Sequence, residues 1–157
     1  MKNYTVKRKI GIIISWFGVA LCMGLIFYLS NQPSVQSAKL SHSFLMIIWK
    51  FFKLDKIDDH IIRKIAHASE YFVLESLLFI SLYLSKDKTM PVTSIIISVL
   101  YCISDEIHQI FIPGRAFMIK DILIDTSGAV ISLAIFLLFF KSILPKIQNK
   151  KLNKIKN

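Results

Sequence analysis

The chain has 157 residues, enough for one domain, and 54% of them are hydrophobic while only 19% are charged. Soluble domains usually contain about 45–50% apolar and about 25% charged residues, and here the surplus is gathered into long blocks. An ordinary soluble domain is therefore excluded, and a protein of the lipid bilayer is predicted. The net charge of +10 comes from basic residues that flank these blocks, which favours anionic lipid headgroups and predicts no nucleic-acid partner.

The first apolar block covers residues 10–29, which are twenty residues without a charge. A helix of that length measures about 30 Å, the hydrocarbon thickness of a bilayer. The block is longer than the apolar core of a signal peptide, so we expect an uncleaved membrane span. Pro33 cannot continue a helix, so this span ends beside Ser30 and Gln32.

The polar stretch 30–65 contains apolar residues at helical spacing between Phe44 and Leu54, and Ser41 is a suitable N-cap for them. This pattern predicts a short amphipathic helix that lies at the membrane interface. A packed helix within a small soluble loop domain is the alternative interpretation.

Three further apolar blocks, at about residues 65–84, 92–112 and 122–140, complete the predicted architecture. The fold class is all-α: an integral membrane four-helix bundle with the amphipathic helix in its first outer loop, forming one domain over residues 1–157. Near the middle of the second block, Glu75 is expected to make a packing hydrogen bond. Cys22 and Cys102 lie inside apolar blocks, where small packing roles are expected.

Four spans place both termini on the same side of a cell membrane. That side would hold twelve of the 20 Lys and Arg residues, and the opposite side would hold eight. By the positive-inside rule, both termini of this multi-pass protein are predicted to lie in the cytoplasm.

With this topology, nearly all the unusual polar residues of the spans fall near the outer face. Several are three or four residues apart and so share a helix face, as do His67 and Glu70, and Asp105 and His108. A charge at the bilayer centre costs at least ~2.5–3.5 kcal/mol, so these groups should face one another or a water-filled cavity. They could form a functional site, or a packing network in which Arg63 or Arg115 neutralises the acidic groups.

Four short motifs in this region also resemble a known family. Residues 63–71 read RKIAHASEY, residues 104–115 read SDEIHQIFIPGR, and residues 121–129 read DILIDTSGA. These segments, with YLSNQP at residues 28–33, resemble in order the motifs of VanZ-like proteins, and the resemblance runs from about residue 28 to 140. It implies a small bacterial membrane protein of a family named for a protein linked to teicoplanin resistance, and its antibiotic context fits a site at the outer face of the cell envelope.

The residues support three classes of function, and the sequence leaves open whether the protein is an enzyme, which cofactor it uses and what its oligomeric state is. In the first, the protein binds or modifies a lipid-linked envelope precursor or anionic glycan. The catalytic candidates are His67 or His108 as general base, oriented by Glu70 or Asp105, together with Asp125. The anion-binding candidates are Arg63, Lys64 and Arg115, and the supporting residues are Ser30, Gln32, Glu106, Gln109 and Asp121.

No metal ligand is assigned in this first class, and Ser30 and Ser104 are nucleophile candidates by position alone. The second class is a metal-dependent membrane enzyme, for which the side chains offering nitrogen and oxygen ligands are His67, Glu70, Asp105, His108, Asp121 and Asp125. The third class is a non-catalytic membrane scaffold or carrier. A polar cluster confined to one face argues against a continuous path for a carrier.

Overall fold

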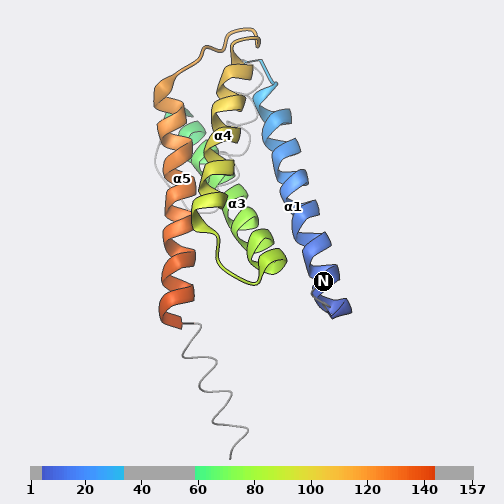
Figure 1. Cartoon of the computed structure of the whole chain (residues 1–157). Helices are drawn as coiled ribbons and strands as arrows, with labels where there is room; N and C mark the ends of the chain where they lie inside the picture. Colours follow the sequence, from blue (N-terminus) through green and yellow to red (C-terminus); the bar gives the residue numbers. More distant parts are fainter. Residues whose placement is uncertain (1–4, 34–58, 144–157) are drawn as a thin grey trace, which may run out of the picture.

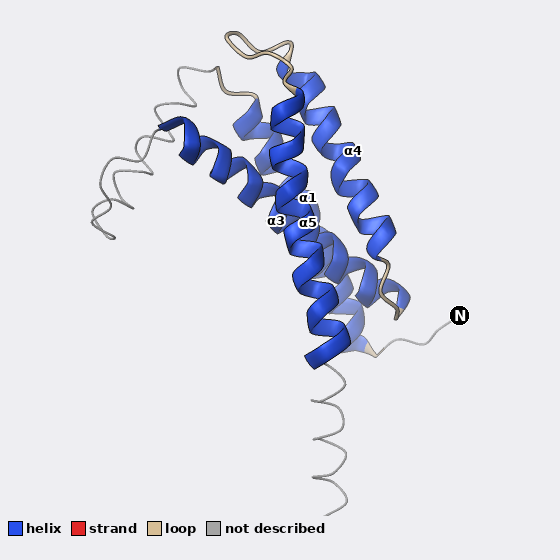
Figure 2. Cartoon of the chain, turned by 90° about the vertical axis from the view of Figure 1, so that its left-hand side faces the viewer, coloured by secondary structure: helices blue, strands red, loops and turns tan. Residues whose placement is uncertain are grey.

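The computed structural model describes residues 5–33 and 59–143, and all regular structure in these ranges is helical (Figures 1 and 2). The predicted all-α membrane bundle is confirmed, and its elements are α1 (Val6–Ser30), α3 (Asp59–Lys86), α4 (Pro91–Gln109), α5 (Ile119–Leu138) and the terminal π-helical turn η1 (Phe139–Ile143). The interfacial helix predicted between Phe44 and Leu54 lies outside the described residues. The predicted spans fall within these helices, except that α4 ends at Gln109 and not at residue 112.

Three of these helices are long and apolar enough to cross a membrane: Val6–Ser30, Lys64–Lys86 and Ile119–Ser142. The remaining helix, α4, begins with Pro91 at its first turn, a position where the missing N–H of proline is harmless. Its 19 residues include a polar face with Asp105 and Glu106, which lowers its hydropathy. The crossing of the membrane by α4 stays a prediction from the sequence.

The central helix is α3, which contacts α1, α4 and α5. Side-chain contacts give its directions relative to two of these neighbours. Leu84 and Leu77 of α3 lie beside Gly11 and Gly18 of α1, so these two helices are antiparallel. Ser76 of α3 contacts Ser132 of α5. Three residues later, the ring of Phe79 contacts the rings of Phe136 and Phe140. Residue numbers therefore rise together along the two helices, so α3 and α5 are parallel.

As a consequence, α1 and α4 end at the same end of the bundle at which α3 and α5 begin, at the top of Figure 1. We name this the polar end, because the polar motif residues lie there. The opposite end carries the α3–α4 turn. The predicted up-and-down order of the spans agrees with this arrangement.

Two helices approach each other closely where Gly128 of α5 meets Ala68 of α3. A Cβ atom added at Gly128 would overlap the backbone carbonyl of Ala68. Small residues commonly permit such backbone contact between membrane helices. The glycine of the third motif therefore sets the spacing of α3 and α5 one turn from the candidate site residues.

The interior of the bundle is more polar than the sequence predicted. The buried face of α4 is polar over its whole length and consists of Ser94, Ser98, Cys102, Asp105, Glu106 and Gln109. Ser94 lies near the start of α4 and donates a 2.7 Å hydrogen bond to Glu75, which is fully buried, so Glu75 has the packing role expected of it. Buried polar groups therefore extend beyond the polar end, through Glu75, which the sequence placed near mid-membrane, and through buried serines that the sequence did not single out.

The outside of the bundle is apolar. Exposed large side chains are frequent on α1, including Ile13 at 68% and Phe17 at 69% exposure, and on α5, including Leu123 at 64%. A surface of this kind suits lipid and not water. The apolar core between the helices consists of Val19, Ile26, Tyr71, Leu74, Leu78, Cys102 and Ala129.

At the opposite end, Arg8 joins the start of α1 to the end of α3. Its guanidinium donates hydrogen bonds of 3.0 and 2.8 Å to the carbonyl of Leu84 and pairs with Asp87 at 2.9 Å. Asp87 follows α3 in a left-handed conformation with φ of 63°, a common way to end a helix. A cation at a helix C-terminus also interacts favourably with the helix dipole.

Candidate functional site

A pocket with a volume of about 130 Å³ lies at the polar end, between the first turns of α3, the first turns of α5 and the loop that joins α4 to α5. Its lining residues are Lys64, His67, Gln109, Gly114, Arg115, Ala116, Met118, Asp121, Ile124 and Asp125. Six of the thirteen predicted site residues are thus brought together here: Lys64, His67, Gln109, Arg115, Asp121 and Asp125.

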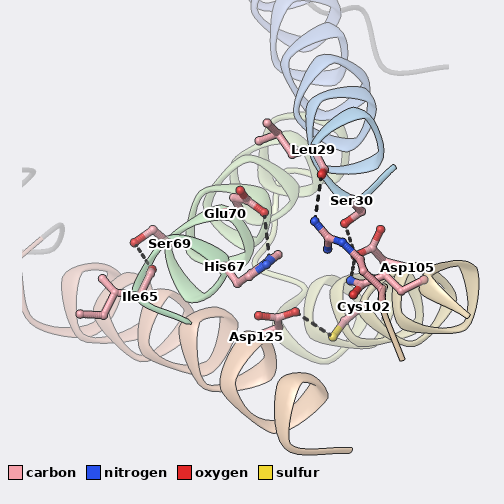
Figure 3. Close-up of polar contacts among 11 residues, drawn as sticks. Leu29, Ser30, Ile65, His67, Ser69, Glu70, Cys102, Asp105 and Asp125 are labelled. Atoms are coloured by element: carbon pink, nitrogen blue, oxygen red, sulfur yellow. Dashed lines mark hydrogen bonds and ion pairs between the residues drawn. The ribbon is translucent and has the colours of Figure 1, made fainter. Parts of the chain in front are cut away.

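The helix α3 contributes Lys64 and His67, which are three residues apart and therefore share a face. The Nδ1 atom of His67 lies 3.5 Å from a carboxylate oxygen of Glu70, and the two side chains are 21% and 22% exposed. His67 also interacts electrostatically with Asp125 and Arg115. In Figure 3 its ring lies between Glu70 and Asp125. The predicted pairing of His67 with Glu70 is therefore present in the structure.

The helix α5 contributes Asp125, which lines the pocket although the residue is only 3% exposed. Its Oδ2 atom accepts a long 3.9 Å contact from the Sγ atom of Cys102, a weak donor (Figure 3). Its Oδ1 atom is buried and has no hydrogen-bond partner among the described residues. Because Gly128 lies one turn further along the same face, the close contact of Gly128 with Ala68 carries Asp125 toward His67, the neighbour of Ala68.

A second polar group lies beside the pocket and ties α1 to α4. Ser30, fully buried at the end of α1, donates a 2.7 Å hydrogen bond to Oδ2 of Asp105 (Figure 3). Gln109 donates to the same oxygen at 3.3 Å. Asp105 thus has a packing role between two helices, and the structure does not place it in the pocket lining.

The loop after α4 is held by charged residues at both of its ends. Arg115 donates to the carbonyls of Gln32 at 3.1 Å and Leu29 at 3.3 Å, the latter in the last turn of α1, where a cation meets the negative end of the helix dipole. Glu106 accepts a 2.6 Å hydrogen bond from the backbone N–H of Met118. Gly114 has a φ of 75°, a conformation that glycine adopts without strain. These contacts orient Arg115 into the pocket lining.

Three more predicted site residues do not appear in the pocket lining: two are placed elsewhere, and the side chain of the third is outside the described residues. His108 stacks on Phe27 of α1 with ring centroids 4.6 Å apart, and it is not part of the pocket lining. The imidazole of the pocket is therefore His67. The backbone of Arg63 lies in α3 one turn before His67, but its side chain is outside the described residues. Gln32 contributes its carbonyl to Arg115, while its side chain donates to the carbonyl of Tyr28 at 3.3 Å.

The structure adds residues that the sequence did not single out. Cys102 approaches Asp125, and Tyr71 is fully buried with a hydroxyl that has no partner among the described residues. Gly114 and Met118 form pocket wall from the loop. Tyr71 and Gly114 both stand inside the quoted motifs, so the motifs themselves held the signal, whereas Met118 stands between two motifs.

The arrangement offers groups for binding and for proton transfer. Ser30 and Ser104, the nucleophile candidates, do not line the pocket: Ser30 is used by Asp105, and Ser104 donates to the carbonyl of Tyr101 at 2.7 Å. Among the side chains that the structure describes, no three from His, Cys, Asp or Glu are placed to hold a metal ion together. What the pocket does present is cationic and anionic groups side by side.

Comparison with known proteins identifies a family. A family model described as VanZ/LLP1 matches residues 15–140, which include all four motifs and every residue of the pocket. The curated proteins and the solved structures give no significant match to this chain.

Proposed function

The chain belongs to the VanZ/LLP1 family, and on that premise we propose that its pocket binds the phosphate or carboxylate of a lipid-linked component of the cell envelope. In this proposal α4 crosses the bilayer as the fourth span, both termini are cytoplasmic, and the polar end faces outward. Binding there protects or alters an envelope component, as in a glycopeptide-resistance role.

The observation that carries this proposal is the convergence of Lys64, His67 and Arg115 on one pocket at the end of a membrane bundle. Guanidinium and ammonium groups are the usual protein ligands of phosphate and carboxylate. The guanidinium of Arg115 is oriented by the last carbonyls of α1 and its continuation. A preoriented cation loses less side-chain entropy when a ligand binds.

The surroundings of the pocket favour a ligand that is attached to a lipid. Next to the lining residues, the α4–α5 loop exposes Phe111 at 76% and Phe117 at 42%, and the first residue of α5, Ile119, is 67% exposed. Apolar side chains at this level insert into the interface between headgroups and acyl chains. An acyl-anchored ligand could therefore keep its chains in the bilayer while its polar group enters the pocket.

Binding is favoured over covalent catalysis in this proposal, because neither nucleophile candidate, Ser30 or Ser104, lines the pocket. His67, which pairs with Glu70, instead supplies a hydrogen-bonding imidazole at one wall of the pocket.

The test is glycopeptide susceptibility in a bacterial host that expresses the chain. We expect the wild-type protein to raise the inhibitory concentration of teicoplanin and the Lys64→Gln variant to lose that increase, because the substitution removes a cation from the pocket. The matched control is Lys88→Gln, which removes an exposed cation from the α3–α4 turn at the opposite end. It should behave as the wild-type protein does.

Membrane levels of all three proteins must be equal for the comparison to count. Equal tolerance in the wild-type and Lys64→Gln strains would show that the pocket has no part in resistance. A second measurement, the lipid phosphate that copurifies with each protein, tests the binding step directly and should fall in Lys64→Gln alone.

A further inference from the structure

We propose that the ligand of this pocket is zwitterionic and carries a primary amine close to its phosphate or carboxylate, as an ethanolamine phosphate headgroup does. This inference rests on the proposed function, because it names the chemical class that the same pocket selects. It is carried by the charges of the lining and by one buried oxygen atom of Asp125.

Among the described residues, the lining contains two basic and two acidic side chains. Lys64 and Arg115 are cationic, and Asp121 and Asp125 are acidic. A ligand with only negative charge would gain from the first pair and be repelled by the second, at separations where the local dielectric strengthens both effects. A ligand with both charges can satisfy both pairs at once.

The acidic and basic groups come from different sides of the pocket. Arg115 is held toward α1 by its bonds to Leu29 and Gln32. Asp121 and Asp125 are four residues apart on α5, so they share a face of that helix. Figure 3 shows Leu29 and Asp125 on opposite sides of His67. This separation suits a phosphate near Arg115 and an amine near α5.

The buried oxygen of Asp125 points to a ligand that donates hydrogen bonds. Asp125 is 3% exposed, and its Oδ1 atom has no hydrogen-bond partner among the described residues. A buried carboxylate oxygen left without a donor is costly, and such groups are normally satisfied by protein, water or ligand. A primary ammonium supplies both the N–H donor and the opposite charge, whereas a quaternary ammonium has no N–H to donate.

The pocket is large enough for such a group. Its volume of about 130 Å³ is well above the ~10–15 Å³ that one water molecule needs by the same measure. A small headgroup therefore fits inside, and the acyl chains of a lipid would extend along the exposed apolar loop that carries Phe111 and Phe117.

The experiment measures the binding of short-chain lipids to the full-length protein in detergent, by calorimetry. The probes are phosphatidylethanolamine, phosphatidylcholine, phosphatidylglycerol and free phosphoethanolamine. We expect phosphatidylethanolamine to bind about tenfold more tightly than either other lipid, which is the effect of one hydrogen-bonded charge pair. Free phosphoethanolamine separates recognition of the headgroup alone from recognition of a lipid. If it binds as tightly as phosphatidylethanolamine, the pocket recognises the soluble group. If it binds more weakly, the pocket recognises the lipid.

The variant Asp125→Asn tests the proposed contact. It keeps the shape of the side chain but removes the charge, so the preference for phosphatidylethanolamine over phosphatidylcholine should fall to about onefold. The matched control, Glu75→Gln, makes the same chemical change at a buried acid outside the pocket and should keep the preference. If Asp125→Asn does not fold, the preference for phosphatidylethanolamine is measured in Asp121→Asn instead. The comparison of lipids on the wild-type protein then still tests the proposal.

The outcomes separate the two proposals. Similar affinities for all three lipids, or tightest binding of phosphatidylglycerol, would overturn the zwitterionic ligand and leave the lipid-binding function in place. Preference retained in Asp125→Asn would also overturn it. If the wild-type protein bound none of the four probes, the proposed binding of a phosphate group by this pocket would itself be overturned.

Discussion

At the scale of single residues, Gly128 lets α5 contact α3 directly, because it lacks the side chain that would otherwise keep the two helices apart. Its motif could be recognised in the sequence, but its partner could not. Gly128 contacts the carbonyl of Ala68, and this contact depends on the packing of α5 against α3. The helix α4 lies between these two helices in the sequence. The same contact explains why Asp125 approaches His67, a pair that the sequence placed at similar depth but on separate spans.

Replacing Gly128 by alanine should destabilise the bundle, because the new Cβ would overlap the backbone of Ala68. Overpacking of this kind typically costs about 1–3 kcal/mol, and we expect a lower unfolding temperature in detergent together with weaker binding at the pocket. The matched control is Gly24→Ala on α1, where a Cβ would meet nothing within 4 Å. Equal unfolding temperatures for the two variants would contradict the close packing described for α3 and α5.

At the scale of elements, the sequence placed the helices well and their ends less well. The apolar residues 110–112 suggested that the third block continued to residue 112, yet α4 ends at Gln109. Turn-type bonds take over there, from Phe111 to His108 and from Ile112 to Gln109, at 3.0 and 3.1 Å. Hydropathy cannot separate a helix from an apolar loop, and the loop is set by the bond of Glu106 to Met118, twelve residues away.

The contact between α1 and the end of α3, at the opposite end of the bundle, was not predicted from the sequence. Arg8 was counted only as one of the flanking basic residues, whereas it binds Leu84 and Asp87 at the end of α3. Its partners are 76 and 79 residues away in the chain, so no local pattern could reveal them. Arg8 therefore has a packing role in addition to its predicted contribution to membrane orientation.

The Arg8→Gln variant should loosen the end of α3. Loss of the cation from the helix C-terminus costs about 1 kcal/mol in a partly exposed setting, so we expect faster hydrogen exchange of the backbone amides at residues 84–88. Lys9→Gln is the control, since Lys9 is exposed one residue further along α1. Unchanged exchange in Arg8→Gln would mean that the contact contributes no stability.

At the scale of the whole molecule, the helix directions bring the polar ends of four separate segments together. The motif residues would be dispersed if any helix ran the other way, because each motif lies toward one end of its helix. The contacts of α3 with α1 and with α5 fix the directions of these helices. These directions bring the residues that line the pocket to the same end of the bundle. Its orientation in the membrane is a prediction from the distribution of basic residues.

The orientation can be measured by labelling with a membrane-impermeant thiol reagent in intact cells, in a background that lacks Cys22 and Cys102. A cysteine placed at Phe111, which is 76% exposed in the α4–α5 loop, should react without lysis because the polar end is predicted to face outward. A cysteine placed at Lys88, in the α3–α4 turn, should react only after lysis. The reverse pattern would invert the proposed topology and remove the outer envelope as the site of action.

The sequence by itself determined that this is an all-helical membrane protein of the VanZ/LLP1 family, because apolar block length, charge placement and motif order are local properties of the chain. It also identified most residues of the pocket, since polar groups inside apolar blocks stand out. Only the tertiary structure decided that His67 and not His108 enters the pocket and that Asp105 ties α4 to Ser30. It also showed that one oxygen of Asp125 has no hydrogen-bond partner among the described residues. Spacing along one helix says which side chains share a face, but the face that a helix turns to its neighbours depends on packing among all of them.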